Sequence, residues 1–323
     1  MPEVSNADDL LSVWRKAALI YAVDERFRQY ASKGVYKGAL YSARGQEVVA
    51  AAMGACLDRE DYLVTTYRGM HDQIAKGADL PGLVAEMFGK RSGTCRGKGG
   101  PMHITDPSCG VLVTTGIVGS GIPIGVGLAW SAKFKGSGQV CATSFGDGAT
   151  NIGAFHEGLN LAAIWNLPVV FVCQNNEYAE FTPRHETQLV EIWQRAAAYG
   201  IQGVRVDGDD AESMYSAMRE AVKKARSGDG PTLLDCQTFR FMGHFFGDPQ
   251  RYMDRGELER RMKADPVPRL RQRLSQLGHA EETLAGIEAE IASEVDRAFE
   301  LAVNADDPAT DELLEDVYLG VAP

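Results

Sequence analysis

The chain of 323 residues is 45% hydrophobic and 24% charged, an ordinary composition for a globular protein of one large or two medium domains. Its formal net charge of −11 argues against a nucleic-acid-binding surface, because such surfaces gather Lys and Arg. No apolar run approaches the roughly 18 residues of a membrane helix. Residues 1–4 lack a signal-peptide pattern, and the six cysteines form no CxxC pair. We therefore expect a cytoplasmic protein with reduced cysteines.

The N-terminal residues 5–33 predict a helix that ends at Gly34. Either Ser5 or Asn6 suits its N-cap. An apolar stripe recurs at helical spacing and is formed by Leu10, Leu11, Trp14, Ala18 and Tyr21. Because this helix lies outside any alternation of strands and helices, we expect it to pack on a neighbouring element or on a partner chain.

A second helix opens at Gly45-Gln46-Glu47 and runs to about Cys56. The segment Thr65–His71 follows as a predicted loop and places Arg68 beside Tyr67. An Arg beside an aromatic residue in a loop either binds a phosphate or is an ordinary surface residue. The sequence leaves both interpretations open.

Residues 92–110 are rich in glycine and basic residues, which predicts a mobile loop. Two interpretations of this loop remain. It is either a flexible connector or an active-site loop that becomes ordered on cofactor binding and carries His103.

Residues 111–134 look like a dinucleotide-binding turn, since a strand over Val111–Thr114 leads into a glycine turn over 116–121 and then a helix. The glycine spacing differs from GxGxxG. No Asp or Glu occurs between Asp106 and Asp147, so the acid that would bind the ribose is absent. The glycines instead give the helix a bare face, which we interpret as a surface for close packing of another helix between subunits: Gly121, Gly125 and Gly127.

Two sharp turns follow two consecutive strands in the central stretch. The strand Val140–Phe145 leads into the turn Gly146–Ala149. After a helix over Ile152–Trp165, the strand Pro168–Cys173 leads into Asn175–Tyr178. Each turn alone is more often an ordinary connection. One helix and one strand join them, however, and open α/β sheets bind ligands at the carboxyl ends of their strands, so together they indicate one site.

The chemistry of these turns favours a metal ion with a phosphate. Asp147 lies between Gly146 and Gly148, which let the backbone approach a phosphate closely. Mg²⁺ prefers near-octahedral oxygen ligands and often keeps substrate phosphates among them. Asp147, an Asn side-chain oxygen, a main-chain carbonyl near Tyr178 and two diphosphate oxygens would nearly complete that set.

Strands and helices continue to alternate after the central stretch: a helix over Leu189–Ala198, a strand over Gly203–Val206, a helix from Asp210 to Gly228 and a strand over Pro231–Thr238. This alternation predicts an α/β fold, with a mainly parallel sheet and helices on both faces. His244 follows the last strand between two glycines. That position suits chemistry, although a lone His is more often structural.

From Glu257 onward the chain is predicted to be helical, with a break at Asp265–Pro268 and a long helix over Glu281–Asn304. The apolar stripe of the long helix is Leu284, Ile287, Ile291, Val295, Phe299 and Ala302. We divide the chain into an N-terminal helical extension (1–34), an α/β domain (35–255) and a C-terminal helical extension (256–323). The tail to Pro323 is a candidate for docking on a partner.

In this order, the motifs resemble the α subunit of the thiamine diphosphate-dependent first component of 2-oxo acid and acetoin dehydrogenase complexes. The resemblance covers most of the chain and implies a thiamine diphosphate-binding fold. The matching segments are Gly45-Gln46-Glu47, Tyr67-Arg68, Gly97–His103, Gly116–Gly119, Gly146–Ala149, Asn175–Tyr178, Arg205–Gly208 and Gly243–Pro249.

The resemblance implies a role for each matching residue. Asp147, Asn176 and the carbonyl of Tyr178 would bind Mg²⁺, and His103 and His244 would be catalytic residues on active-site loops, with His244 nearest the reacting centre. The residues that would contact the cofactor are Tyr67, Arg68, Gly116, Val118, Gly146, Asp147, Gly148, Ala149, Asn176, Tyr178 and His244.

The resemblance also implies partners and a reaction. Thiamine diphosphate needs a second domain whose glutamate protonates the aminopyrimidine, and only one α/β unit is found here. The family supplies that domain as a separate β subunit, usually in an α₂β₂ tetramer. The cofactor would cleave a C–C bond next to a carbonyl group, and the acyl unit would pass to a lipoyl acyltransferase.

Three residues depart from the family pattern. Tyr41 stands where pyruvate-type chains carry a His, and Phe245 replaces a serine that is phosphorylated in animal pyruvate enzymes, which excludes that regulation here. Glu180 stands where small or apolar residues are usual, which leaves a different substrate open. Because Gly243–Pro249 resembles acetoin-type chains more, we expect acetoin or a related α-hydroxyketone as substrate, with pyruvate or a branched 2-oxo acid as the alternative. A nicotinamide-dependent dehydrogenase and a non-catalytic scaffold subunit are the remaining interpretations.

Overall fold

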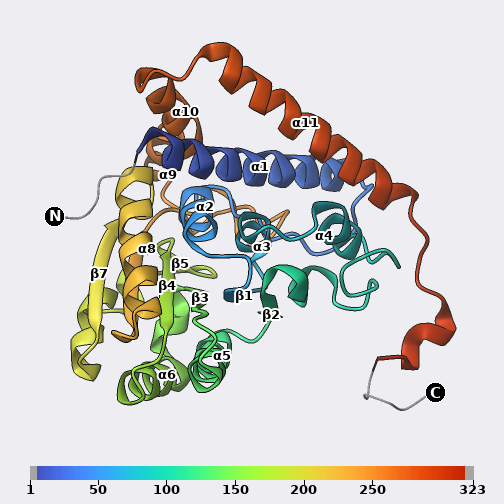
Figure 1. Ribbon diagram of the computed structural model, residues 1–323. Helices are drawn as coiled ribbons and strands as arrows, with labels where there is room; N and C mark the ends of the chain where they lie inside the picture. Colours follow the sequence, from blue (N-terminus) through green and yellow to red (C-terminus); the bar gives the residue numbers. More distant parts are fainter. Residues whose placement is uncertain (1–5, 317–323) are drawn as a thin grey trace.

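A six-stranded, wholly parallel sheet forms the centre of the computed structural model, which describes residues 6–316 (Figure 1). The strand order is β2-β1-β3-β4-β8-β7. The strands are β1 Tyr62–Thr66, β2 Val111–Thr115, β3 Cys141–Gly146, β4 Val169–Asn175, β7 Gln202–Asp207 and β8 Thr232–Gln237. A separate antiparallel hairpin consists of β5 (Tyr178–Ala179) and β6 (Thr182–Pro183).

Helices cover both faces of the sheet. They are α1 Ala7–Ser32, α2 Glu47–Cys56, α3 Met70–Lys76, α4 Leu80–Met87, α5 Gly121–Lys135, α6 Gly153–Ile164, α7 Arg184–Thr187, α8 Ala211–Arg226, α9 Arg255–Lys263, α10 Pro266–Gln276 and α11 Glu281–Asn304. Short 3₁₀ helices are η1 Gly100–Met102, η2 Pro107–Cys109, η3 Asp147–Asn151, η4 Ile192–Tyr199 and η5 Thr310–Leu314.

Successive side chains of β4 point to opposite faces of the sheet, as the pleat requires. Val170 and Val172 pack with the cluster formed by α1, α2, α8 and α11. Val169 and Phe171 pack with α5, α6 and the 3₁₀ helix η4 on the other face. A strand that is buried on both faces is a near-continuous apolar run, which is how the sequence presents β4. The predicted α/β fold with a mainly parallel sheet is therefore confirmed.

The helices α1 and α11 lie over the upper face of the molecule and cover α2, α3 and α4 (Figure 1). Asn6 caps α1, and Ser5 lies outside the described residues. The buried stripe of α1 differs from the predicted one, because Leu11, Ala18 and Tyr21 lie at its margin. The fully buried apolar positions are Leu10, Val13, Trp14, Ala17, Ile20, Val23 and Phe27. This helix thus packs on its own chain. The division at residues 34 and 255 stays a prediction.

Several short elements differ from the sequence prediction. Thr65 and Thr66 belong to strand β1 rather than to a loop, and the helices α3 and α4 were not predicted. The helix predicted over residues 189–198 is the 3₁₀ helix η4, which begins at Ile192. These elements have five to eight residues, and tertiary contacts rather than periodicity decide structure at that length.

The glycines of α5 serve a different purpose from the predicted one. A Cβ added at Gly125 would lie 2.8 Å from the Cβ of Thr143 on β3, and one at Gly121 would lie 3.1 Å from Val64 on β1. Both glycines let the helix approach its own sheet closely, so the prediction that this face packs between subunits is wrong for them. Only Gly127 has open space beside it.

No helix within residues 6–316 is long and apolar enough to cross a membrane. The three cysteines predicted to fill the core, Cys141, Cys173 and Cys236, are fully buried in their strands, and all six cysteines are free. The cytoplasmic location stays a prediction.

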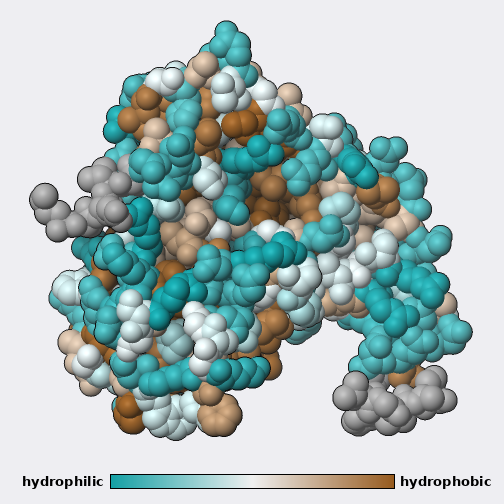
Figure 2. All heavy atoms as spheres, in the orientation of Figure 1, coloured by the Kyte–Doolittle hydropathy of each residue, from teal (hydrophilic) through white to brown (hydrophobic). Residues whose placement is uncertain are grey.

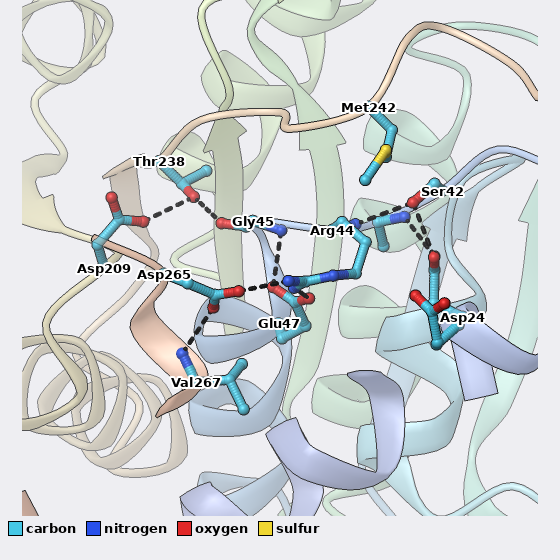
Figure 3. A network of polar contacts seen from close by, with 12 residues as sticks. Asp24, Ser42, Arg44, Gly45, Glu47, Asp209, Thr238, Met242, Asp265 and Val267 are labelled. Carbon is cyan, nitrogen blue, oxygen red and sulfur yellow. Dashed lines mark hydrogen bonds and ion pairs between the residues drawn. The ribbon is translucent and has the colours of Figure 1, made fainter. Parts of the chain in front are cut away.

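A buried ion-pair network joins the loop before α2 to distant parts of the chain (Figure 3). The Arg44 guanidinium pairs with Glu47 at the start of α2 and with Asp265, the N-cap of α10. On the other side of the same loop, Asp24 of α1 accepts hydrogen bonds of 2.9 Å from the Ser42 hydroxyl and from the main-chain N–H of Ala43. The network fixes this loop between the first, second and tenth helices.

Substitution of Arg44 by Met is expected to destabilise the protein by roughly 3–5 kcal/mol, because it leaves Glu47 fully buried without its cation. The matched control is Arg15→Met, which removes an exposed ion pair with Glu290 and should cost less than about 1 kcal/mol. Denaturant unfolding followed by circular dichroism measures both. Equal losses in the two variants would contradict the role of the network.

Asp209 adds a pH-dependent contact to this region. Burial raises the pKa of Asp209 to about 6. The Thr238 hydroxyl lies between the Gly45 carbonyl and the Asp209 carboxyl, 3.0 Å from the latter, and has one proton to donate. Thr238 donates to the Asp209 carboxyl, and this bond lowers the pKa of Asp209, but burial is the larger effect and raises it.

The folded-state pKa of Asp209 lies above that of the unfolded chain, so its contribution to stability is complete below pH 4 and is lost as the pH rises through 6. Asp209→Asn keeps an oxygen that accepts from Thr238 and carries no charge at any pH, so it should be more stable than the parent at pH 7 by up to about 3 kcal/mol. The difference should close at pH 4. Unfolding curves at both pH values test this, with the exposed Asp229→Asn as control. A difference that does not depend on pH would refute it.

Candidate cofactor site

A cleft of about 440 Å³ lies where the parallel strands end. The turns after β1, β2, β3, β4 and β8 all line it, because parallel strands present their carboxyl ends at the same edge of the sheet. The lining residues are Tyr41, Gln46, Thr66, Tyr67, Arg68, His71, Met102, Gly116, Val118, Gly119, Ser144, Phe145, Gly146, Asp147, Gly148, Ala149, Gln174, Asn176, Tyr178, Ala179, Glu180, Arg240 and His244.

Asp147 is the most unusual group in the cleft. Its side chain is 1% exposed, and neither carboxylate oxygen has a hydrogen-bond partner. Burial raises the pKa of Asp147 to about 7, with a further contribution from the charge of Glu177. An ionised carboxylate left unpaired in the interior is unfavourable. The site therefore lacks a cation or a hydrogen-bond donor that a ligand would supply.

Asn176 and the β5–β6 hairpin lie close to the Asp147 turn. The Asn176 side-chain oxygen accepts from the Tyr178 N–H at 3.2 Å, and its amide nitrogen donates to Gln46 at 2.8 Å. A Cβ added at Gly148 would lie 2.7 Å from the Cβ of Ala179, so only glycine permits this approach of the turn to the hairpin. The oxygen atoms predicted as metal ligands thus border one cleft.

Two guanidinium groups also line the cleft, and within residues 6–316 neither Arg68 nor Arg240 has a carboxylate partner. Arg68 donates to the Ser42 carbonyl at 2.8 Å, and Arg240 donates to the Glu180 carbonyl at 2.7 Å. Burial, together with the charge of Arg240, lowers the pKa of Arg68 to about 10. Two buried cations without counter-ions favour an anionic ligand with several oxygen atoms, such as a diphosphate.

His244 is held from several sides. Nη2 of Arg68 lies 3.2 Å from its Nδ1 and 3.0 Å from its carbonyl oxygen. Because a guanidinium only donates, Nδ1 must accept, and the proton of the neutral ring lies on Nε2. Burial and the charges of Arg68 and Arg240 lower the pKa of His244 to about 4. The ring is therefore neutral at pH 7 and can donate a hydrogen bond through Nε2.

A buried polar network lies beneath the cleft. Gln174, inside the apolar strand β4, donates to Asp72 at 2.9 Å and to Ser144 at 2.8 Å, and its side-chain oxygen lies 2.7 Å from Nε2 of His71. Nδ1 of His71 lies 2.9 Å from the Arg68 carbonyl. These bonds fix the main chain that carries Arg68.

The glycine-rich segment is organised around one buried carboxylate. Glu86 of α4 is 0% exposed and accepts four main-chain N–H groups at 2.8–2.9 Å, from Cys95, Gly97, Gly99 and Gly100. Because glycine has no side chain, the main chain at Gly97, Gly99 and Gly100 can approach the Glu86 carboxylate closely. A loop predicted from its composition to be mobile is thus wrapped around a fixed charge.

On its outer side the same segment is paired with the C-terminal 3₁₀ helix η5. Arg96 donates to Glu312 and Glu315 at 2.8 Å and to Asp316 at 3.0 Å. Lys98 donates to Asp316 at 2.8 Å. These ion pairs are exposed or half-buried. The segment is therefore fixed from inside by Glu86 and from outside by surface charges.

The structure brings together all the residues predicted to contact the cofactor, because every one of them lines the cleft. His103 is exposed and is not among the lining residues. It lies beside them, since a Cβ added at Gly116 would be 3.7 Å from its Cε1. The catalytic role of His103 stays a prediction.

Sequence reasoning missed Arg240, Gln174 and Glu86. The first two are polar residues within apolar runs at the ends of β8 and β4, a signal that could have marked them. Glu86 lies in an unpredicted helix and gave no local signal. Its partners are 9 to 14 residues further along the chain.

A family model described as the dehydrogenase E1 component matches residues 15–311. The chain belongs to the dehydrogenase E1 component family. Chains of this family depend on thiamine diphosphate, so the predicted class, a thiamine diphosphate-dependent oxidoreductase, is confirmed. The glycine turn at residues 116–121 is thus part of an E1 cleft and not a nicotinamide-binding turn.

Curated relatives match the E1 chain over nearly its whole length. The alpha subunit of the acetoin:2,6-dichlorophenolindophenol oxidoreductase of Bacillus subtilis is 42% identical over 96% of this chain and 93% of its own. The alpha subunit of the same name from Cupriavidus necator is 42% identical over 97% of this chain and 95% of its own. The pyruvate dehydrogenase E1 component subunit alpha of Rhizobium meliloti is 35% identical over 98% of this chain and 92% of its own. As an E1 alpha chain, this protein works with a beta subunit.

Glu86→Ala is expected to free the main chain of residues 95–100, because four N–H groups lose a charged acceptor. Hydrogen exchange of these amides should accelerate by at least about 100-fold, since the exchange rate follows the free energy of local opening. Glu86→Gln keeps one acceptor oxygen, so its amide exchange rates should lie between those of the parent and those of Glu86→Ala. The control Glu60→Ala removes an exposed carboxylate and should change nothing there. Unchanged exchange in Glu86→Ala would contradict this account of the loop.

Proposed function

We propose that this chain is the α subunit of a thiamine diphosphate- and Mg²⁺-dependent dehydrogenase component that cleaves acetoin or a related α-hydroxyketone. The component would be an α₂β₂ tetramer that passes the acyl unit to a lipoyl acyltransferase. The observation that carries the proposal is the buried, unpartnered Asp147 in one cleft with Arg68 and Arg240. A divalent cation would satisfy the carboxylate, and diphosphate oxygens would satisfy both the cation and the guanidinium groups.

The residues around Asp147 fit such a pair. Asp147, the Asn176 side-chain oxygen and the Tyr178 carbonyl would hold Mg²⁺. Nothing lies within 4 Å of the position where a Cβ would project from Gly146, so a phosphate can approach the main chain there. Only one of the three proposed ligands is an acidic side chain, so no cluster of three acidic, His or Cys side chains marks the site within residues 6–316.

Bound thiamine diphosphate supplies the nucleophilic carbon and the electron sink for C–C cleavage. This chain contributes orientation and a proton donor. Arg68 fixes the His244 tautomer, and the neutral imidazole offers its Nε2 proton to an oxygen of the substrate. Tyr41 and Tyr67 pack edge-on around the same ring, with centroids 5.6 and 5.9 Å away, and limit the movement of the imidazole.

An apolar surface supports the proposed assembly. Apolar side chains are exposed over α5 and α6, at the lower end of the molecule (Figure 2). The centre of the Trp130 ring lies 5.5 Å from that of Phe134 and 6.4 Å from that of Trp165. Ile164 is also exposed there. Exposed apolar groups of this size are typical of a surface that a second subunit covers.

The test is to produce the chain with its β-type subunit and to follow reduction of a dye with acetoin, pyruvate and branched 2-oxo acids in parallel. We expect turnover that requires thiamine diphosphate and Mg²⁺, with acetoin or another α-hydroxyketone preferred. Turnover on a 2-oxo acid alone would refute the proposed substrate class. Cofactor-independent turnover, or none with any substrate, would refute the function.

Asp147→Asn should weaken cofactor binding by more than the roughly 10–100-fold that loss of an outer-shell partner costs, because it removes a charged metal ligand. Titration of the assembled component with thiamine diphosphate and Mg²⁺, followed by protein fluorescence, measures the affinity. The control Asp229→Asn, at an exposed position, should bind normally. Normal affinity in Asp147→Asn would show that the metal site is misassigned.

A further inference from the structure

At the tip of the β5–β6 hairpin, Glu180 adopts a backbone conformation that is unfavourable for residues other than glycine. The hairpin has a two-residue turn, Glu180-Phe181, and Glu180 has φ +54°. Glycine is the usual residue at the first position of such a turn, because a Cβ is strained at positive φ. Arg240 holds this conformation by donating to the Glu180 carbonyl at 2.7 Å. The turn therefore carries Glu180 at a position where glycine, which has no Cβ, would be less strained.

The Glu180 carboxylate lines the cleft beside His244. The distance from Glu180 Oε1 to His244 Nε2 is 3.9 Å, which is too long for a hydrogen bond. The Glu180 side chain is 59% exposed, and within the described residues its carboxylate oxygens have no hydrogen-bond donor. It thus points at the nitrogen that carries the His244 proton and keeps both oxygens available to a ligand.

The hairpin tip is fixed against the same histidine. The Phe181 ring lies 5.8 Å from the His244 ring and 5.2 Å from the ring of Tyr252. Tyr252 donates to Asp248 at 2.6 Å, and Asp248 accepts from the His244 main-chain N–H at 2.6 Å. These contacts fix the hairpin tip beside His244, and the Glu180 side chain extends from that tip along the cleft.

The electrostatic consequence depends on the substrate. A 2-oxo acid carries a carboxylate on the carbon next to its reacting carbonyl group, so Nε2 of His244 cannot donate to that carbonyl without bringing the substrate's negative charge near Glu180. Two like unit charges about 4 Å apart repel by roughly 1 kcal/mol in bulk water and about 4 kcal/mol near a protein surface, so a side chain that is 59% exposed still contributes a repulsion. An α-hydroxyketone has no charge, and its hydroxyl group can donate to the Glu180 carboxylate.

We propose that Glu180 determines substrate specificity, because its carboxylate beside His244 disfavours 2-oxo acids and accepts a hydrogen bond from neutral α-hydroxyketones. This inference rests on the proposed function and adds the residue responsible for the substrate class. Glu180 acts on the charge of the substrate and not on the cofactor.

The experiment compares a charged and a neutral ligand with the same 2-oxo core, pyruvate and methyl pyruvate, binding to the assembled component loaded with thiamine diphosphate and Mg²⁺. Glu180→Gln removes the charge and keeps the shape. We expect the affinity for pyruvate relative to methyl pyruvate to rise at least tenfold, which corresponds to about 1.4 kcal/mol. The gain should shrink at high ionic strength, because salt screens the repulsion in the parent. The control Glu186→Gln, an exposed carboxylate on α7, should leave the ratio unchanged.

A second variant guards against misfolding of the hairpin. Glu180→Gly places the residue that positive φ favours at this turn, so it should fold at least as well as the parent and shift the ratio in the same direction. Cofactor affinity equal to that of the parent shows that the site is intact. An unchanged pyruvate to methyl pyruvate ratio in either intact variant would overturn the proposal. Turnover of acetoin is measured separately and tests only the proposed function.

Discussion

The buried ion pairs of Arg44 are the constraint on which the cleft depends. They join Glu47 at the start of α2 to Asp265 at the start of α10, residues that are more than 200 positions apart. The loop between α1 and α2 is held in place as a result. That loop supplies one wall of the cleft, including Gln46, which binds Asn176, and the Ser42 carbonyl, which positions Arg68. A charge pair far from the reacting atoms thus sets the position of groups that contact the ligand.

The charges of the cleft are balanced only when a ligand is present. Within residues 6–316 the Asp147 carboxyl has no hydrogen-bond partner, and neither Arg68 nor Arg240 has a carboxylate partner. The charge of Arg240 lowers the pKa of Asp147, but burial outweighs that attraction and raises the pKa to about 7. Burying these charged groups without partners costs folding free energy, and binding of a complementary ligand offsets that cost. Preorganised sites generally arise in this way. Membership of the E1 family explains which ligand restores the balance.

Much of the fold could be predicted from the sequence, because the alternation of apolar strands and amphipathic helices repeats along residues 111–238 and is a local signal. The presence of Asp147 and Asn176 in one cleft was also accessible, since one helix and one strand return the chain to the same sheet edge. Glu86 and Arg240 were not accessible, because their roles arise from contacts that no local pattern encodes. The 3₁₀ helix at Ile192 and the glycine face of α5 were misjudged for the same reason. The residue composition of these segments suggested one structure, but their packing against the sheet determined another.

The two anchors of the glycine-rich segment have different physical characters, and salt affects them differently. Glu86 lies in the interior, where dissolved ions do not reach, whereas the pairs of Arg96 and Lys98 with η5 lie at the surface, where they do. A rise in ionic strength therefore weakens the outer anchor and leaves the inner one intact. Met102 of this segment lines the cleft, and Gly100, two residues before it, is held by Glu86. The anchor that positions this part of the cleft wall is thus the one that salt does not weaken.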